Sequence, residues 1–346
     1  MSQNQKTGDN STNIQAEKIE VSVGMTYSEV KEVALDVFKA NYLKLSEDAS
    51  KTALERSIEI TEKFLNKLEN TNPQGINNAQ DPDFQHSLFN VQKEYARYGD
   101  EEMGDLLIDL LVDRTNQPNR SILQIVLNES ITVAPKLTQE QLATLSIVFL
   151  VRYTMQNGII SFNSLFEYFD KYILPFSGFL VENTSCYQHI EYTGCGSVGI
   201  GEVNFLEVIK KNYKGLFCKG FTKEDVEAIG LNYSLVSACF TKCLHDNTLL
   251  QINAINEEVF VKNAKSFNVS DNDSNKLIEL ENSKIMNVDE ISFFLIKNRP
   301  YLQNFIDIWK TSLIKNLTLT SVGITIGHAN VKRNLGEFTN LSIWIN

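Results

Sequence analysis

No proline or glycine occurs between residues 25 and 72, and this uninterrupted stretch is the feature that most restricts the fold of the chain. Apolar residues recur through it at the three- and four-residue spacing of one helix face. Its start, Thr26-Tyr27-Ser28-Glu29, has the capping-box pattern, in which the side chains of Thr26 and Glu29 satisfy each other's backbone amides. The stretch predicts one very long helix, or two helices with a break near Ser46-Glu47-Asp48.

The same apolar spacing continues through the first half of the chain and returns near its end. It predicts helices over 82–98, 100–113, 119–134, 138–156, 161–174, 203–213, 234–244 and 288–309. The densely apolar helices 138–156 and 161–174 are expected to form a hairpin at the core of the body. The chain is therefore predicted to be mainly α.

Alternating apolar residues predict a small β contribution. Leu341–Ile345 alternates as a strand does, whereas 317–331 fits either a strand or one helix face, with the helix favoured. The polar segments 70–82 and 269–275 are expected to be loops. The predicted fold class is a multi-helix body with minor β contributions from the N- and C-terminal strands.

The length of the chain allows two domains or one large helical domain. At 346 residues it exceeds the size at which single cores stop growing, about 250–300 residues. We expect a polar arm and terminal strand over 1–24, a helical domain over 25–180 and a mixed α/β C-terminal domain over 181–346.

The alternating segment near the N-terminus predicts self-association. Ile19, Val21 and Val23 alternate with Glu20 and Ser22. A lone strand cannot satisfy its own backbone groups, so it must pair with a sheet elsewhere, such as the strand predicted at the C-terminus, or with another copy. Ile19, Val21 and Val23 are therefore the candidate oligomerisation residues, and the predicted assembly is a homo-oligomer.

Charge and hydropathy argue against two classes of partner. The net charge is −11 and no run of basic residues exceeds two, so the footprint of a nucleic-acid-binding protein is missing. The first residues lack the apolar core of a signal peptide, and no apolar window reaches the length that spans a bilayer, about 18 residues. We expect a cytoplasmic protein with no membrane partner.

A glycine cluster is the candidate cofactor-binding site. Gly194-x-Gly196-x-x-Gly199, with Ser197 inside it, matches the dinucleotide fingerprint, in which backbone amides approach a pyrophosphate. The preceding 187–192 is a poor strand and no alternation of strands and helices follows. The alternative is a glycine-rich loop packed between domains, and no cofactor is predicted. Cys195 and His189 beside the cluster form a conceivable nucleophile pair.

Three residues form a weak candidate metal site. On the predicted helix, Cys239 and Cys243 share a face, and His245 follows at its end. Cys218 or Cys195 would have to supply a fourth ligand. Buried thiols that pack as small apolar groups are the favoured alternative. The odd number of five cysteines indicates reduced thiols rather than a disulfide framework.

An acidic stripe follows one predicted helix. Glu101, Asp105, Asp109 and Asp113 recur one turn apart, a spacing that allows cation binding. A solvated helix face is the favoured interpretation. No catalytic residues are predicted from the four histidines, which stand in unrelated contexts.

Several phrases resemble an uncharacterised bacterial family across the whole chain. The phrases are Gly8-Asp9-Asn10-Ser11, Ile14-Gln15-Ala16, Tyr27-Ser28-Glu29-Val30, Ala34-Leu35-Asp36-Val37-Phe38, Ala134-Pro135-Lys136-Leu137-Thr138, Lys219-Gly220-Phe221 and Leu341–Ile345. The resemblance implies no catalytic residue. The N-terminal arm also resembles segments of bacterial proteins encoded near defence and mobile-element genes, which implies a defence role by association.

Two functions follow as expectations. The first is a non-enzymatic, self-associating interaction or sensor protein with a possible protein partner, which rests on the terminal strand and the amphipathic first helix. The second is a nucleotide- or small-ligand-binding enzyme with its site at Gly194–Gly201. A zinc-stabilised module at Cys239, Cys243 and His245 is a third possibility.

Overall fold

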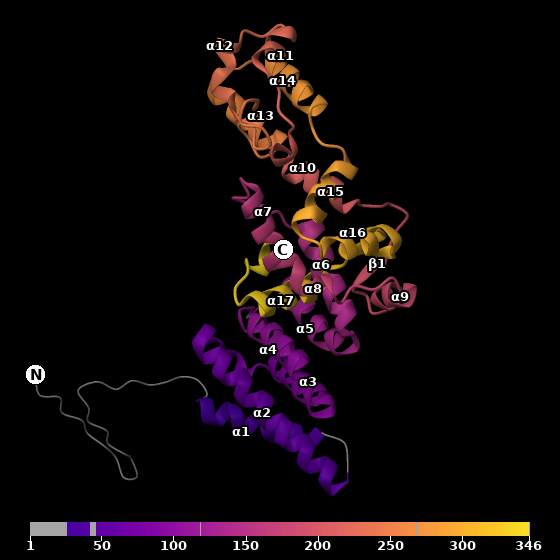
Figure 1. Cartoon of the computed structure of the whole chain (residues 1–346). Helices are drawn as coiled ribbons and strands as arrows, with labels where there is room; N and C mark the ends of the chain where they lie inside the picture. Colours follow the sequence, from indigo (N-terminus) through magenta and orange to yellow (C-terminus); the bar gives the residue numbers. More distant parts are fainter. Residues whose placement is uncertain (1–25, 42–45, 118, 268, 346) are drawn as a thin grey trace, which may run out of the picture.

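Helices make up most of the protein in the computed structural model (Figure 1). The structure describes residues 26–41, 46–117, 119–267 and 269–345. The described strands form two small antiparallel sheets, so the predicted mainly α fold class is confirmed. The predicted strand with Ile19, Val21 and Val23 lies outside the described residues.

The long stretch without proline or glycine forms two helices, α1 (Tyr27–Asn41) and α2 (Glu47–Thr71). The predicted capping box is present, because Glu29 accepts from the Thr26 amide at 2.7 Å and Thr26 Oγ1 accepts from the Glu29 amide at 3.3 Å. Helix α2 begins directly after Ser46, so the predicted break is also confirmed.

The remaining helices of the first half begin where capping residues predict them. Their bounds are α3 (Pro82–Tyr98), α4 (Glu101–Thr115), α5 (Ile122–Val133), α6 (Gln139–Tyr153), α7 (Phe162–Tyr168) and α8 (Leu174–Ser177). Asp81 accepts from two amides at the start of α3, and Gly99 ends that helix at φ +63°. The segment expected to be a loop over 70–82 contains a 3₁₀ helix, Pro73–Gln80.

The second half contains short elements and one long central helix. The bounds are α9 (Thr184–Tyr192), β1 (Gly196–Val198), α10 (Phe205–Asn212), α11 (Lys223–Ala228), α12 (Tyr233–Val236), β2 (Phe240–Lys242), β3 (Leu250–Ile252), α13 (Glu257–Ala264), α14 (Asp271–Ser283), α15 (Val288–Asn298), α16 (Leu302–Thr311), β4 (Leu317–Leu319) and α17 (Ser321–Leu335). Strand β1 pairs with β4, and β2 pairs with β3. The ambiguous 317–331 is thus a strand followed by a helix.

Helix α17 packs most extensively against α6, and it also contacts α4 and α5. The expected apolar hairpin is only part of this core, since α6 contacts α8 but has α17 as its main neighbour. A Cβ on Gly327 would lie 2.8 Å from the Leu145 carbonyl oxygen, and one on Gly323 would lie 1.8 Å from that of Cys195. These two glycines allow α17 to approach α6 and the segment before β1.

Buried apolar side chains form two main cores. The larger one, here called the body, includes residues from α1 to the 3₁₀ segment at Phe217 and again from α15 to the C-terminus. The second, here called the small core, comprises residues between Cys218 and Leu280. Figure 1 shows α11 to α14 at one end of the molecule and α1 and α2 at the other. The predicted boundary at 180/181 stays a prediction.

Three local predictions are wrong. The segment 234–244 is a short helix, a 3₁₀ turn and β2 instead of one helix. The segment 269–275, expected to be a loop, contains the start of α14. Residues 187–192, which make a poor strand, lie in α9. Leu341–Ile343 is a 3₁₀ helix, with no strand over 341–345. Short runs fit more than one period, and the packing of neighbours decides between them.

Candidate functional site

The glycine cluster does not have the geometry of a dinucleotide cradle. Gly194 ends α9 at φ +76°, and Gly196 lies in β1, where a Cβ would meet Leu317 Cδ1 at 2.7 Å. Gly194 thus supplies the left-handed turn after α9, and Gly196 allows β1 to pack closely against β4. The next helix, α10, begins only at Phe205.

Partners within the fold already occupy the amides around Ser197. Glu191 accepts from the Val198 amide at 3.1 Å and from Ser197 Oγ at 3.3 Å. The Gly199 amide donates to the Asn316 carbonyl at 3.1 Å. A carboxylate in this position repels a phosphate. That Gly194, Gly196, Ser197 and Gly199 bind a small ligand stays a prediction.

The conceivable nucleophile pair is not assembled. Cys195 is fully buried, and this burial raises the pKa of its thiol, which opposes thiolate formation. The ring of His189 instead lies 3.0 Å from the side-chain amide of Gln141. Neither residue is therefore placed to activate the other.

The weak candidate metal ligands are also separate. Because 234–244 is not one helix, Cys239 and Cys243 do not share a helix face. The Cys243 thiol donates to the Cys218 carbonyl at 3.3 Å, and His245 Nε2 lies 2.9 Å from the Leu216 carbonyl. Within the described residues, no group of three or more His, Cys, Asp or Glu side chains is arranged to hold a metal ion.

The acidic stripe of α4 is divided by the tertiary structure. Asp109 is 3% exposed and pairs with Lys67 at 2.6 Å, and Asp113 pairs with Lys332 of α17 at 2.8 Å. Glu101 and Asp105 are exposed. The stripe is thus neither a cation site nor a uniformly solvated face, because two of its carboxylates fix α4 against other helices.

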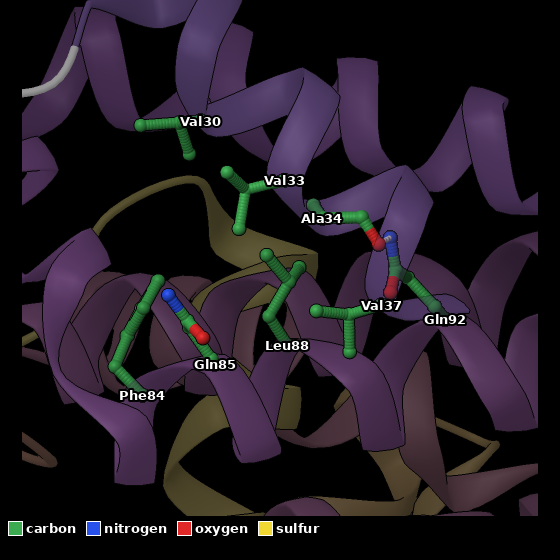
Figure 2. A pocket seen from close by; sticks show the side chains of 8 residues that line it. All are labelled: Val30, Val33, Ala34, Val37, Phe84, Gln85, Leu88 and Gln92. Carbon is green, nitrogen blue, oxygen red and sulfur yellow. Dashed lines mark hydrogen bonds between the residues drawn. The ribbon is translucent and has the colours of Figure 1, made fainter. Parts of the chain in front are cut away.

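Two of the surface cavities lie along α3. A polar one of about 440 Å³ lies above Arg114, which is 1% exposed and donates to Asp83 at 2.7 Å and to Asn128 at 3.0 Å. The guanidinium lowers the pKa of Asp83. The other is an apolar crevice of about 10 Å³ between α1 and α3 (Figure 2). That is about the volume of one water, so the crevice is a packing seam.

The cavity under the C-terminal segment combines three kinds of chemistry. This C-terminal pocket has a volume of about 240 Å³. Its lining residues are Asp113, Asn116, Gln117, Leu123, Leu127, His328, Lys332, Phe338, Thr339, Asn340 and Leu341. They come from the end of α4, from α5, from α17 and from the chain after it. No sequence signal joins them, because the charged pair spans more than two hundred residues.

His328 holds the C-terminal segment over this pocket. It is 2% exposed, its Nε2 lies 2.6 Å from the Thr339 carbonyl oxygen, and its ring contacts those of Phe338 and Trp344. Burial lowers its pKa, so the neutral imidazole donates from Nε2. Trp344 Nε1 in turn donates to the Tyr153 carbonyl at 2.8 Å.

Strand β2 has outward backbone groups at Lys242 that pair with no described residue, whereas the outward amide of Phe240 donates to the Ser237 carbonyl. The Asn253 amide donates to the Cys239 carbonyl, and the Cys243 amide donates to the Leu249 carbonyl. In an antiparallel pair of strands, every second residue forms such bonds, and the residues between them turn their backbone groups outward. The backbone groups of Lys242 therefore point away from β3. The structure gives these groups no partner among the residues that it describes. The far side of β3 is covered, because Leu250 exchanges two hydrogen bonds with Phe221.

The other small sheet has partners along the outer side of β4 and at one amide of β1. Arg152 of α6 donates to the Leu317 carbonyl, and the Tyr153 hydroxyl accepts from the Leu319 amide at 2.9 Å, so the outer side of β4 is occupied. Glu191 accepts from the Val198 amide on the outer side of β1. Lys242 of β2 therefore offers an outward amide and carbonyl to a further strand.

The fold and these sites define a mainly α-helical protein with a polar pocket and a partly open strand edge. A family model described only as ":-like" matches residues 24–345. This match covers most of the chain, so the protein belongs to that family, whose description states no activity. It confirms a resemblance over the whole helical part and begins after the N-terminal arm. Comparisons with curated proteins and with solved structures found no match.

No helix among the described residues is both long and apolar enough to cross a bilayer.

Proposed function

We propose that this protein is a non-enzymatic, self-associating interaction or sensor protein of the bacterial cytoplasm. In this proposal, Ile19–Val23 of one copy adds as a strand to β2 of another. The partly open edge of β2 is the observation that carries it. A strand formed by Ile19–Val23 needs partners for its backbone groups, and the outward amide and carbonyl of Lys242 offer matching ones.

The positions of the two partners favour pairing between copies. Ile19–Val23 stands a few residues before α1, and Figure 1 places α1 and the small core at opposite ends of the molecule. A strand tethered to α1 therefore meets β2 most readily on a second copy. Because the two surfaces differ, the contact is heterologous and generates a ring or a filament.

Light scattering on a sizing column tests this proposal. The full-length protein is expected to be an oligomer, and a variant that lacks residues 1–24 is expected to be a folded monomer. Lys242→Pro removes the outward amide without touching the β2–β3 ladder, so it should also give a monomer. Lys242→Thr keeps that amide and is the matched control. A monomeric full-length protein, or an oligomer that both changes leave intact, contradicts the proposal.

A role in phage or mobile-element defence is supported by the resemblance of the N-terminal arm, by association. The plating efficiency of phages on cells that express the protein or its Lys242→Pro variant tests this role. Protection that requires the intact edge is expected, and equal plating on all three strains, including cells without the protein, contradicts it.

A further inference from the structure

The C-terminal pocket has one charged wall and one apolar wall. The charged wall is the ion pair between Lys332 Nζ and Asp113 Oδ1, 2.8 Å apart, whose side chains are 28% and 19% exposed. Asn116, Gln117 and Asn340 also line the pocket, and the side-chain oxygen of Asn340 accepts from the Ser342 amide. The apolar wall consists of Leu123, Leu127, Phe338 and Leu341.

The charged wall restricts the charge of an occupant. A molecule with a single charge would pair with one member of the ion pair and leave the other without its partner in a half-buried cavity, which costs free energy. A zwitterion satisfies both, since its ammonium approaches the Asp113 carboxylate while its carboxylate accepts from the Lys332 ammonium. The side-chain amides that line the pocket can then bond to the remaining polar atoms.

The size and the apolar wall restrict the rest of the molecule. A volume of about 240 Å³ is below the roughly 300–1,000 Å³ of pockets that take drug-sized ligands. An aliphatic side chain fits against the leucine side chains that line the pocket. The C-terminal segment, held by His328, covers one side of this half-open pocket.

We propose that the C-terminal pocket binds a free aliphatic α-amino acid, with its ammonium on Asp113 and its carboxylate on Lys332. The bound amino acid links α4, α17 and the C-terminal segment, which the ion pair and His328 already connect. This site is independent of the proposed self-association, since it involves neither β2 nor the N-terminal arm.

Thermal unfolding of the unaltered protein with three probes tests the site. L-leucine at 10 mM should raise Tm by about 2 °C or more, because it binds the native state only. Isoamylamine and 4-methylpentanoate carry one charge each on the same branched skeleton, and each should leave Tm within the error. No shift with L-leucine, or an equal shift with either single-charge probe, overturns the proposal.

Three variants then locate the site. Lys332→Met and Asp113→Asn should each abolish the leucine shift. Lys315→Met, which removes an ion pair with Glu202 at 3.1 Å outside the pocket, is the matched control and should keep the shift. Heat released on titration of L-leucine into the same proteins is the second readout. A leucine shift that survives both pocket variants places the binding elsewhere and overturns the proposal.

Discussion

The body and the small core reach a folded state by different means. The body is built from long capped helices around α17, and its buried side chains are mostly apolar. The small core has short helices, strands of three residues and many single backbone bonds between loops. The body is specified by the repeated apolar spacing along its helices. The small core depends on individual contacts, each of which fixes a few residues.

The two regions also differ in how they bury charge. In the body, Arg114 is 1% exposed and makes hydrogen bonds of 2.7 to 3.0 Å. At the joint with the small core, Lys214 lies 3.4 Å from Glu281 and 3.6 Å from Glu257. The Lys214 ammonium and Glu281 Oε1 have no hydrogen-bond partner in the described structure. Such a loose pair repays little of its desolvation cost.

The largest expected effect is in the body, at the approach of α17. Gly323→Val places a Cβ where the Cys195 carbonyl lies, so it should destabilise the protein by about 4 kcal/mol or prevent folding. Urea unfolding followed by circular dichroism measures this. Gly178→Ala is the control, since a Cβ there meets nothing within 4 Å. Equal unfolding midpoints for the two variants would show that the close approach does not hold the body together.

The next effect concerns the joint. Lys214→Met leaves Glu281 buried without its counter-charge and should cost about 3 kcal/mol. Adding Glu281→Leu removes the orphaned charge and should restore stability. Urea unfolding of the single and double variants measures the coupling free energy between Lys214 and Glu281. A double variant as unstable as Lys214→Met would contradict the interpretation that this pair is loose and repays little of its desolvation cost.

A smaller effect tests whether the cores unfold separately. Leu277 and Leu145 are both fully buried, in the small core and in the body respectively. Leu277→Ala should cost about 2 kcal/mol and should speed hydrogen exchange only in peptides from 218–285. Leu145→Ala should speed exchange throughout the body. Faster exchange in both regions for Leu277→Ala would mean that the molecule unfolds as one unit.

The smallest expected effect is on how stability depends on pH, which Glu281 and Asp83 change in opposite directions. Burial raises the pKa of Glu281 above its ordinary 4.5, so its contribution to stability is present below that value and is lost as pH rises through the folded pKa. The hydrogen bond from Arg114 lowers the pKa of Asp83 below 3.8, so that contribution is lost as pH falls through the folded pKa. The urea midpoint of each variant is measured across pH. Glu281→Gln should lose the fall in stability with rising pH, and Asp83→Asn should lose the fall in stability with falling pH. Unchanged slopes would contradict the assignment.

The sequence predicted the helices of the body well because their signals are local. The Thr26–Glu29 box, Asp81 before Pro82 and Gly99 after Tyr98 each act within four residues of a helix end. The small core was predicted poorly, since 234–244 has a helical spacing but the pairing of β2 with β3 overrides it. The surroundings of the candidate site residues could not be predicted for the same reason, because neighbours distant in sequence place the glycine, cysteine and acidic residues.

What the sequence alone determined is the class of fold, a mainly α protein with capped amphipathic helices, because periodicity and capping act over single turns. Only the tertiary structure decided that α17 lies against α6, that β1 pairs with a strand more than a hundred residues away, and that Asp113 meets Lys332 beneath the C-terminal segment. These contacts join residues that share no local pattern, so they follow from the packing of the whole chain.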